Sequence, residues 1–497
     1  MQSNNLQRKN KVVNNSSNVL NEIVEYKRGE VNRLKQQAPL EAFIDTLTES
    51  KISLEAALSQ PGNRYILEYK KASPSRGDIR PDFTVEQCFS AYEPCADAYS
   101  VLTESKYFNG SHRFIEQLRK LTDKPILCKD FIVDEYQIYQ ARHVGADAIL
   151  LMLSVLSDSE YCYLVSVANK LGLDVLTEVH TEQECLRAIK YHAKIIGINN
   201  RNLIDLTTDL AVTEQISQLI PDDRLVISES GVNSRQDVTR LAAHCDGFLI
   251  GTSLMSQRDV GLAAKALVYG RVKVCGVRSV ATAQQSLALG ASYLGLMFYP
   301  KSKRYIGLDL AKQIRQQVDG LLVGVFVDQP IEYILEVQEQ CQLDIIQLHG
   351  GEAVSYIESL RQQLSAHCLI WKAIPISRFD DLSSIPELQS LVDCVVLDYK
   401  ANGNFGGQGE SFDWQLLKQM PQQVETERLV IAGGIDASNV NQLSNYSDAI
   451  IDLSSALETS PEQQPEYNSA SYYLDKDVKR IELFFSHCRN NGKHNQG

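Results

Sequence analysis

The sequence predicts an α/β protein built from two consecutive (β/α)8 barrels of the TIM type, with an extra helix at the N-terminal end. At 497 residues the chain is too long for one ordinary hydrophobic core, so two or three domains are expected. Short runs that are apolar on both faces recur along the chain, and each is followed by an amphipathic segment, as in a parallel sheet covered by helices. Eight such runs occur in each half, and eight β–α units in roughly 250 residues are typical of this barrel.

The first half begins with a polar stretch, residues 1–17, which we expect to be disordered. VLNEIVEYKRGEVNRLK, from Val19, then has helical spacing with charges of both signs on its outer face. The eight apolar runs of this half begin at residues 65, 98, 125, 147, 174, 194, 225 and 247. Residues 18–268 are therefore predicted to form the first barrel.

The second half repeats the pattern, with apolar runs that begin at residues 272, 293, 321, 344, 369, 394, 429 and 449. We predict a second barrel over residues 269–497. The boundary falls near Gly270, in ALVYGRVKV, with almost no linker. A single doubly wound domain with many strands is the alternative, although its length would be unusual.

Composition excludes several classes of function. A net charge of −13 opposes general binding to nucleic acid or to an anionic membrane surface. The eleven cysteines show no paired C-x-x-C spacing, so neither a zinc site nor a disulfide framework is indicated. The polar N-terminus lacks the apolar stretch of a signal peptide, and no run reaches the length of a membrane helix. We therefore expect a cytoplasmic protein without a membrane partner.

Ionisable side chains stand at the ends of the strands predicted for the first half. Glu68 and Lys70 end the first run, in ILEYKKASPS, where alternation places them on the same face as the apolar Ile66. Further strand ends carry Glu104, Lys129 and Asp130, Glu178, Asn199 and Arg201, and Glu229 and Ser230. Active sites of TIM barrels lie at the C-terminal ends of the strands, so these groups are predicted to converge on one mouth. A solvated rim is the alternative. In such a cluster a lysine beside another cation should have a lowered pKa, and a crowded glutamate a raised one.

Each half closes with a glycine-bearing turn. SESGVNS followed by IGTS in the first half matches AGGIDAS followed by DLSS in the second. Loops after strands seven and eight often present backbone N–H groups to a phosphate, so one phosphate site is predicted in each barrel. Ordinary tight turns are the alternative.

These motifs identify a resemblance. The first half resembles indole-3-glycerol-phosphate synthase through ILEYKKASPSRG, SVLTESKYFNGS, ILCKDFIVDEYQIYQAR, GINNRNL and ISESGV. From VKVCGV onward the chain resembles phosphoribosylanthranilate isomerase through MFYPKSKRYI, IIQLHG, VVLDYK, GGQGESFDW and AGGI. Together the halves resemble the fused, bifunctional enzymes of tryptophan biosynthesis.

The resemblance implies two consecutive reactions. The C-terminal barrel would isomerise N-(5′-phosphoribosyl)anthranilate to 1-(2-carboxyphenylamino)-1-deoxyribulose 5-phosphate by an Amadori rearrangement. The N-terminal barrel, a carboxy-lyase, would cyclise and decarboxylate that product to indole-3-glycerol phosphate. Neither family needs a metal or an organic cofactor. The partners would be these phosphorylated anthranilate–sugar substrates, and the protein would be a monomer that binds no nucleic acid.

In the synthase half the resemblance implies five catalytic residues. Lys129 would be the general acid for the substrate carbonyl, and Glu178 would exchange the protons of dehydration. Lys70 would hold a substrate carboxylate or phosphate and is a second candidate for the acid. Glu68 would position both lysines, and Asn199 would hydrogen-bond Glu178 and the substrate hydroxyls. Which lysine donates in which step stays open, and a purely structural Glu68–Lys70 ion pair is the alternative.

Substrate and phosphate contacts of the synthase are implied at Ser73, Phe108, Arg201, Ser230, Gly231, Gly251 and Thr252. Phe108 is expected to pack on the anthranilate ring, although a plain core aromatic would have the same appearance in sequence.

In the isomerase half the resemblance implies Cys275 as the base for the C2′ proton and Asp398 as the acid for the furanose oxygen. A cysteine base must be a thiolate, so we expect the pKa of Cys275 to lie below its free value of about 8.5. Asp398 must carry its proton until substrate binds, which partial burial favours. Arg304 would meet the anthranilate carboxylate through its planar guanidinium.

The other isomerase contacts are implied at His349, Gly406, Gly407, Gly433, Gly434, Ser454 and Ser455. His349 could equally be a satisfied core histidine. Two features depart from the isomerase pattern: Ala456 stands where the family often has glycine, and residues 461–477 replace a short turn, as in a surface insertion.

Two rival functions remain at the level of sequence. A different phosphosugar isomerase or lyase could use the same fold, because fold alone does not determine chemistry. In the other rival, one barrel is catalytically degenerate and serves as a scaffold.

Overall fold

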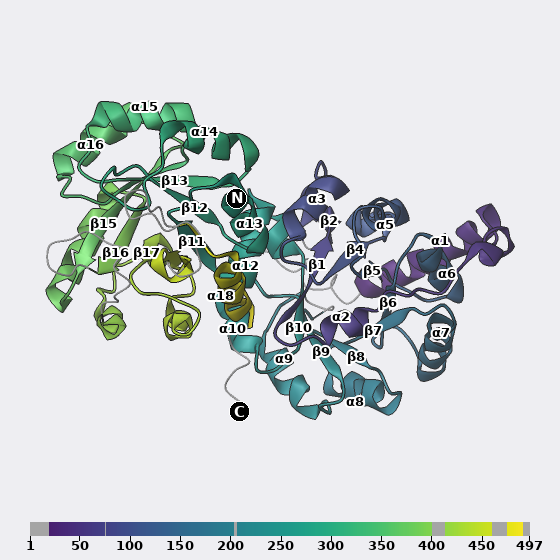
Figure 1. The fold of residues 1–497 in the computed structure, drawn as a ribbon. Coiled ribbons are helices and arrows are strands. Elements are labelled where there is room, and N and C mark those ends of the chain that lie inside the picture. The colour runs from purple at the N-terminus through teal and green to yellow at the C-terminus, as the bar shows by residue number, and fades with distance from the viewer. Residues whose placement is uncertain (1–18, 75, 203–205, 400–412, 460–474, 491–497) are drawn as a thin grey trace, which may run out of the picture. The chain divides into compact units, whose positions relative to one another are not determined.

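The computed structural model describes residues 19–74, 76–202, 206–399, 413–459 and 475–490. The chain divides into two compact units between Ala264 and Lys265, within helix α12 (Val260–Tyr269). Each unit contains one closed barrel of eight parallel strands, with helices around the outside (Figure 1). The predicted pair of (β/α)8 barrels is confirmed. The polar tail over residues 1–17 lies outside the described residues.

The first barrel closes in the order β1-β10-β9-β8-β7-β6-β5-β4. Its strands are β1 (Arg64–Tyr69), β4 (Ala98–Leu102), β5 (Ile126–Lys129), β6 (Ala148–Met152), β7 (Asp174–Val179), β8 (Ile195–Asn199), β9 (Leu225–Glu229) and β10 (Gly247–Ile250). Its helices are α1 (Val19–Gln37), η2 (Leu40–Ala42), η3 (Ile44–Thr46), α2 (Leu54–Leu58), α3 (Val85–Tyr92), α4 (Ser105–Phe108), α5 (His112–Arg119), α6 (Glu135–His143), α7 (Asp158–Lys170), α8 (Glu182–Lys190), α9 (Ala211–Ile216), η4 (Ser217–Leu219), α10 (Arg235–Leu241) and α11 (Thr252–Met255). The extra N-terminal helix predicted from Val19 is therefore present. A small antiparallel hairpin after β1, made of β2 (Ala72–Ser73) and β3 (Gly77–Asp78), was not predicted.

The second barrel runs in chain order from β11 to β18, and β18 pairs with β11 to close it. Its strands are β11 (Arg271–Cys275), β12 (Tyr293–Met297), β13 (Leu321–Phe326), β14 (Ile345–Leu348), β15 (Leu369–Ile376), β16 (Cys394–Tyr399), β17 (Leu429–Ile431) and β18 (Ile450–Leu453). Its helices are α13 (Val280–Leu289), α14 (Leu308–Gln317), α15 (Ile331–Cys341), α16 (Val354–Gln363), η5 (Phe379–Ser384), α17 (Ile385–Leu391), η6 (Trp414–Gln419), η7 (Thr426–Arg428), η8 (Val440–Tyr446), η9 (Ser455–Leu457) and α18 (Val478–Asn490). Between β17 and β18 the covering element is the 3-10 helix η8.

The interior of the first barrel is apolar at its centre. In the first barrel Ile66, Leu127, Leu176 and Ile227 belong to one buried cluster, to which all eight strands contribute. Two residues beyond Ile66, the same inward face carries the carboxylate of Glu68, which is only 2% exposed. Along β1 the inward face therefore changes from apolar side chains in the packed core to ionisable side chains at the C-terminal end.

At the opposite, N-terminal ends of the strands, the same type of hydrogen bond to an aspartate recurs. In five places an aspartate just before or at the start of one strand accepts a hydrogen bond from a backbone N–H at the start of its neighbour. The pairs are Asp97 with Tyr65, Asp147 with Ile126, Asp246 with Val226, Asp344 with Leu322 and Asp393 with Ile370, at 2.7–3.0 Å. Each carboxylate satisfies a donor that the strand ladder leaves unpaired. These hydrogen bonds therefore link adjacent strands at the N-terminal ends of both barrels.

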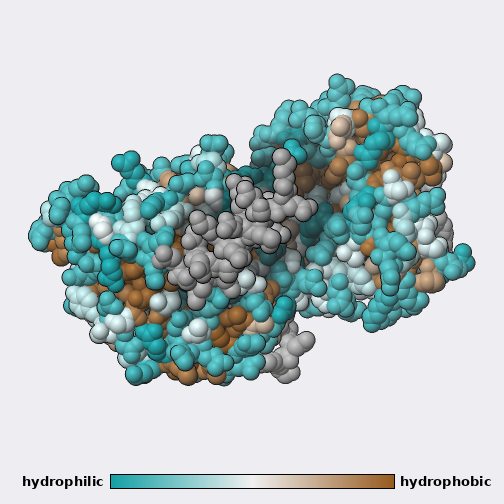
Figure 2. Space-filling model, turned by 180° about the vertical axis from the view of Figure 1, so that it is seen from behind, coloured by the Kyte–Doolittle hydropathy of each residue, from teal (hydrophilic) through white to brown (hydrophobic). Residues whose placement is uncertain are grey.

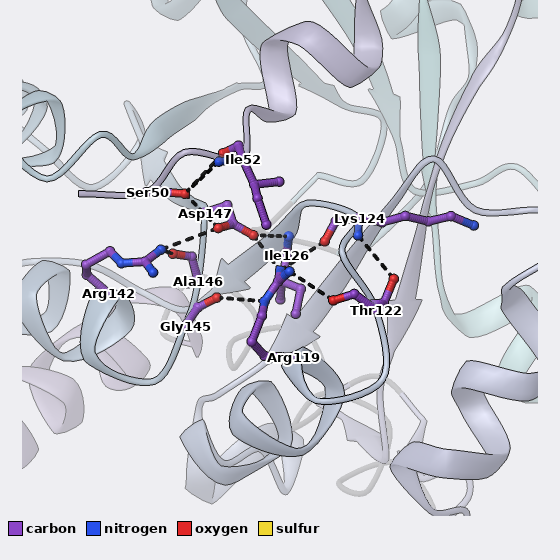
Figure 3. Close-up of polar contacts among 10 residues, drawn as sticks. All are labelled: Ser50, Ile52, Arg119, Thr122, Lys124, Ile126, Arg142, Gly145, Ala146 and Asp147. Atoms are coloured by element: carbon purple, nitrogen blue, oxygen red, sulfur yellow. Dashed lines mark hydrogen bonds and ion pairs between the residues drawn. The ribbon is translucent and has the colours of Figure 1, made fainter. Parts of the chain in front are cut away.

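Asp147, one of these aspartates, has several side-chain partners (Figure 3). It is 1% exposed and contacts Arg119 at 2.5 Å, Arg142 at 3.4 Å and the Ser50 hydroxyl at 2.7 Å. Arg119 in turn donates to the carbonyl oxygens of nearby loops, including that of Gly145. The network therefore joins two helices, a loop and a strand at the end of the barrel remote from the mouth.

We expect Asp147→Asn to destabilise the first barrel by about 2–4 kcal/mol, because the two guanidinium groups lose the carboxylate that compensates them. Both tryptophans, Trp371 and Trp414, lie in the second unit. A urea transition that moves in circular dichroism but not in tryptophan fluorescence therefore belongs to the first barrel. The exposed Asp123→Asn is the matched control and should change stability by less than about 0.5 kcal/mol. Equal stability of the two variants would contradict this role.

The face shown in Figure 2 is largely hydrophilic, and apolar residues appear on it as separate patches. Among the described residues, no helix is both long and apolar enough to cross a bilayer.

Two candidate active sites

A cavity of about 490 Å³ opens at the C-terminal ends of the first barrel's strands. Its lining includes all twelve residues that the sequence assigned to the synthase site: Glu68, Lys70, Ser73, Phe108, Lys129, Glu178, Asn199, Arg201, Ser230, Gly231, Gly251 and Thr252. These residues come from every part of the barrel sequence, and folding brings them around one space. The lining also contains apolar groups such as Leu150 and Leu249, which form the floor above the core.

Lys129, at the end of β5, lies at the centre of the charged groups. Its ammonium contacts Glu229 at 2.6 Å and Glu68 at 3.7 Å. Glu68 also pairs with Lys70 at 2.5 Å. The Glu68–Lys70 pair is thus part of a larger network that faces the cavity, and the two lysine side chains are 15–16% exposed while those of Glu68 and Glu229 are almost completely buried. This geometry leaves the two cations as the groups within reach of a bound molecule.

The charges of Lys129 and Glu68 stabilise each other. Burial alone would lower the pKa of Lys129, but Glu229, Glu68 and Glu178 together raise it above its usual range. Burial alone would raise the pKa of Glu68, but Lys70 and Lys129 hold it below its ordinary value. The sequence-based expectation of a lowered lysine pKa is therefore wrong for Lys129, because carboxylates rather than other cations are its nearest neighbours.

Glu178 behaves as the crowded carboxyl that was expected. Burial and the negative charge of Glu229 raise its pKa to about 7, against the opposing effects of Lys129 and of Asn199. Asn199 Nδ2 donates to Glu178 Oε1 at 3.1 Å, as anticipated. A carboxyl with a pKa near neutrality can both accept and return a proton at physiological pH.

We expect Glu178→Gln to stabilise the first barrel by about 1–2 kcal/mol at pH 8 and to leave its stability unchanged at pH 4. The folded pKa of Glu178 is raised above the unfolded value, so the folded state retains a proton that the unfolded state releases. Ionisation therefore costs stability progressively as pH rises from about 4.5 to 7, and glutamine removes that cost. Urea unfolding followed by circular dichroism at both pH values is the measurement, with the exposed Glu182→Gln as control. A stabilisation equal at pH 4 and pH 8 would contradict the assignment.

Helix α1 contributes to this site, which the sequence reading did not anticipate. Val19, Leu20 and Ile23 line the cavity. Lys27 is 3% exposed and pairs with Asp130 at 2.9 Å. Asp130 directly follows Lys129 in the chain. Burial would lower the pKa of Lys27, but Asp130 and Glu30 raise it to about 12, so Lys27 carries its charge in this contact. The helix is therefore fastened to the end of β5.

Glu104 differs from its sequence-based description, Phe108 and Arg201 match theirs, and Arg76 had none. Glu104, expected at the mouth, is completely buried and caps helix α4 by accepting from three backbone N–H groups, including that of Phe108. Phe108 itself lines the cavity, beside Lys70. Arg76, which the sequence reading did not single out, lines the cavity with Arg201, and burial and Arg76 lower the pKa of Arg201. The position of Arg76 three residues after Ser73 was the available signal.

The second barrel places its candidate residues at the matching strand ends. Cys275 ends β11, Asp398 lies in β16, and His349 follows β14. His349 Nε2 lies 3.1 Å from Asp398 Oδ2, so the half-buried histidine contacts the candidate acid. Ser454 Oγ donates to the Cys275 carbonyl oxygen at 3.4 Å.

Arg304 is held by a carboxylate of the protein itself. Its guanidinium contacts Glu458, which Lys476 also contacts at 3.0 Å. Lys476 is 4% exposed and donates to the Ser454 carbonyl oxygen as well. The interpretation of residues 461–477 as a surface insertion is therefore wrong at its C-terminal end, because Lys476 is buried in the site. Residues 460–474 lie outside the described part.

The two closing turns have similar backbone conformations. Ser230 and Gly231 follow β9 with φ values of 63° and 86°, and Gly433 and Gly434 follow β17 with 90° and 64°. Each turn therefore uses the left-handed region at two successive residues, a conformation that favours glycine. Ser454, Ser455 and Ala456 follow β18 as expected, while Gly406 and Gly407 lie outside the described residues.

The pKa of Cys275 does not match the expectation. Burial raises it above the ordinary value of a thiol, although Lys273, Lys476 and Arg304 act in the opposite direction. Cys275 is 6% exposed, and desolvation of a thiolate is the larger effect. The predicted low pKa is thus wrong.

Two barrels with buried acid–base groups at their functional ends define a class: an enzyme of the TIM-barrel fold with two sites in one chain. Residues 20–267 match the indole-3-glycerol phosphate synthase family, and residues 272–466 match the N-(5′-phosphoribosyl)anthranilate isomerase family. The chain is 41% identical to the tryptophan biosynthesis protein TrpCF of Vibrio cholerae, over 95% of this chain and 96% of that protein. It is 40% identical to TrpCF of Haemophilus influenzae, over 90% and 94%. A solved phosphoribosylanthranilate isomerase from Thermotoga maritima is 30% identical, covers 44% of this chain and 98% of that one, and has a TM-score of 0.36. The chain belongs to the TrpCF family.

The protein is therefore a bifunctional enzyme of tryptophan biosynthesis. Its C-terminal barrel isomerises N-(5′-phosphoribosyl)anthranilate to 1-(2-carboxyphenylamino)-1-deoxyribulose 5-phosphate, and its N-terminal barrel converts that product to indole-3-glycerol phosphate. Nothing favours a degenerate barrel kept as a scaffold.

Proposed function

We propose that ring closure in the first barrel is driven by Lys129 as the general acid and Glu178 as the proton-exchanging group. Lys129 would protonate the substrate carbonyl oxygen while the aromatic carbon attacks. Glu178, with a pKa of about 7, would then take and return the protons of dehydration. Glu68 would position Lys129 and Lys70, and Lys70 would hold a substrate carboxylate or phosphate. Asn199 would orient Glu178 and bind substrate hydroxyls.

The substrate would lie across the cavity, with its two charged ends at different parts of the wall. Ser230, Gly231, Gly251 and Thr252 would bind the phosphate through backbone and hydroxyl donors. Arg201 and Ser73 would contact the remaining polar groups of the substrate. Phe108 would pack on the anthranilate ring.

For the second barrel we propose Asp398 as the acid that opens the furanose ring and Cys275 as the base for the C2′ proton. His349 would orient Asp398 through their 3.1 Å contact. Arg304 would bind the anthranilate carboxylate, which would compete with Glu458. The phosphate would be bound by Gly406, Gly407, Gly433, Gly434, Ser454 and Ser455.

We further propose that the functional boundary lies between residues 268 and 269, and that the enzyme is a cytoplasmic monomer without a nucleic-acid partner. The net charge of −13 opposes binding to polyphosphate backbones. All side chains assigned to each site come from one chain, so a second copy is not needed to complete either site.

The observation that carries the proposal is the contact of Lys129 with two carboxylates inside the cavity that also contains Glu178. The test is to supply each substrate separately to the purified full-length chain and to variants that disable one barrel at a time. Loss of both activities in every variant would count against two separate sites.

A further inference from the structure

Lys273, two residues before Cys275 on β11, is completely buried although neither proposed catalytic role uses it. A sealed ammonium is rarely found in a protein interior unless it is paired. Its Nζ contacts Asp452 Oδ2 on β18 and Gln347 Oε1 on β14, each at 2.7 Å. An ammonium has three donors, so these two contacts leave one for a further acceptor.

Cys275 is the neighbour that can use this donor. Alternation along β11 places Lys273 and Cys275 on the same inward face. A Cβ atom added at Gly295, on the adjacent strand β12, would lie 2.7 Å from Cys275 Sγ and 3.0 Å from Lys273 Cε. The sulfur and the last carbon before the ammonium therefore border the same small space, which stays open because residue 295 has no side chain.

The contacts continue from Lys273 to the proposed acid. Gln347 Nε2 lies 3.0 Å from His349 Nδ1, and His349 Nε2 lies 3.1 Å from Asp398 Oδ2. Side chains from β11, β14 and β16 thus connect the base and the acid beneath the site. The carboxylate of Asp452, on β18, balances the charge of Lys273. Gln347 can serve this link because its amide both accepts, from Lys273, and donates, toward His349.

We propose that Lys273 is a positioning residue of the isomerase reaction: its buried ammonium is the counter-ion of the Cys275 thiolate and ties the base, through Gln347 and His349, to Asp398. This inference rests on the proposed roles of Cys275 and Asp398. In the proton-abstraction step the C2′–H bond breaks, its electron pair enters the ring-opened iminium system, and an S–H bond forms on Cys275. Lys273 keeps its proton throughout and supplies charge compensation alone.

The other charges that face Cys275 do not replace Lys273. Arg304 and Lys476 also favour the thiolate, but both are paired with Glu458. Asp452 disfavours the thiolate, and Asp398 and His349 act on Asp452 in turn. Lys273 is the strongest of the groups that favour ionisation of the thiol. Loss of its charge should therefore raise the pKa of Cys275, and loss of Asp452 should lower it.

The test measures the pH dependence of isomerase kcat/KM in the full-length chain. In Lys273→Met the acidic limb of the pH profile, which reports ionisation of the base, should move up by about one pH unit or more. At a pH below the pKa of Cys275 in both the wild type and the variant, kcat/KM should therefore be roughly tenfold lower in the variant. In Asp452→Asn the same limb should move down. The pH dependence of Cys275 alkylation by iodoacetamide, followed by peptide mass spectrometry, should shift in the same two directions. Lys372→Met removes another buried lysine of this barrel, one that is paired with Glu352, and should lower stability without moving the limb.

Opposite shifts of the acidic limb in the two variants would support the proposal, because a merely structural role of Lys273 and Asp452 would not move the limb in opposite directions. An unmoved limb in folded Lys273→Met, or shifts of both variants in one direction, would overturn it. If Lys273→Met does not fold, Asp452→Asn decides: a downward shift supports the proposal and no shift overturns it. Cys275→Ser separates this failure from that of the proposed function. If that variant keeps isomerase activity, the assignment of the base fails and this inference falls with it.

Discussion

Lys129→Met will lose ring closure by about 10³-fold or more in kcat, while the isomerase reaction continues at its normal rate. Methionine keeps the length and the apolar stem of the side chain but removes the ammonium that Glu229 contacts at 2.6 Å and Glu68 at 3.7 Å. Without that cation the carbonyl oxygen has no acid, and the nearby carboxylates lose the charge that stabilises them. When phosphoribosylanthranilate is supplied, the deoxyribulose phosphate intermediate should accumulate, and chromatography of the reaction mixture measures it.

Lys71→Met is the matched control for this experiment. Lys71 follows Lys70 directly, but alternation turns it away from the cavity, and its ammonium contacts the Pro81 carbonyl oxygen and the ring of Phe114. Ring closure should therefore survive in Lys71→Met. Retention of ring closure in Lys129→Met together with its loss in Lys70→Met would transfer the role of the acid to Lys70.

The sequence predicted the fold because each strand is buried on both faces and so has its own local pattern. All sixteen apolar runs became barrel strands, and their starts differ by one residue or less from the predicted ones. The connections were less predictable: η8 replaces the expected α-helix, and the β2–β3 hairpin depends on a loop rather than on periodicity. Local pattern therefore explains the strands better than the connections.

The position of the first site was predictable for the same reason, since strand ends in a closed barrel must meet. The partners within it were not. Lys129 and Glu229 are 100 residues apart, and Lys273 and Asp452 are 179 apart. Which strand-end groups touch depends on the closure of the barrel and on the lengths of the side chains, neither of which local pattern reports.

The errors in pKa have one common cause. The pKa of Lys129 and that of Cys275 are each a difference between a large desolvation effect and several charge interactions of opposite sign. Sequence identifies the groups but not their distances, so it cannot determine which effect is larger. Lys273 was nonetheless visible in sequence, because an ionisable residue two positions before a proposed base shares its face, as Gln347 does with His349.

Cys275→Ser and Asp398→Asn will each reduce isomerase kcat by about 10³-fold or more and leave ring closure intact. Serine keeps the size of the side chain, but its hydroxyl is a far weaker acid than a thiol and will not supply an anionic base, even with Lys273 beside it. Asparagine keeps the contact with His349 but has no proton to give to the furanose oxygen. The measurement is a pair of assays on each full-length variant, one with phosphoribosylanthranilate and one with the deoxyribulose phosphate.

The second substrate decides the interpretation, because it bypasses the isomerase barrel. Full activity with the deoxyribulose phosphate, together with loss with phosphoribosylanthranilate, would place Cys275 and Asp398 in the first reaction only. Loss with both substrates would mean that the substitutions disturb more than one barrel. Since each barrel has its own closed strand ladder and its own apolar core, damage confined to β11 or β16 has no reason to reach Lys129 or Glu178. Separate loss of the two activities is therefore what two independently packed cores require.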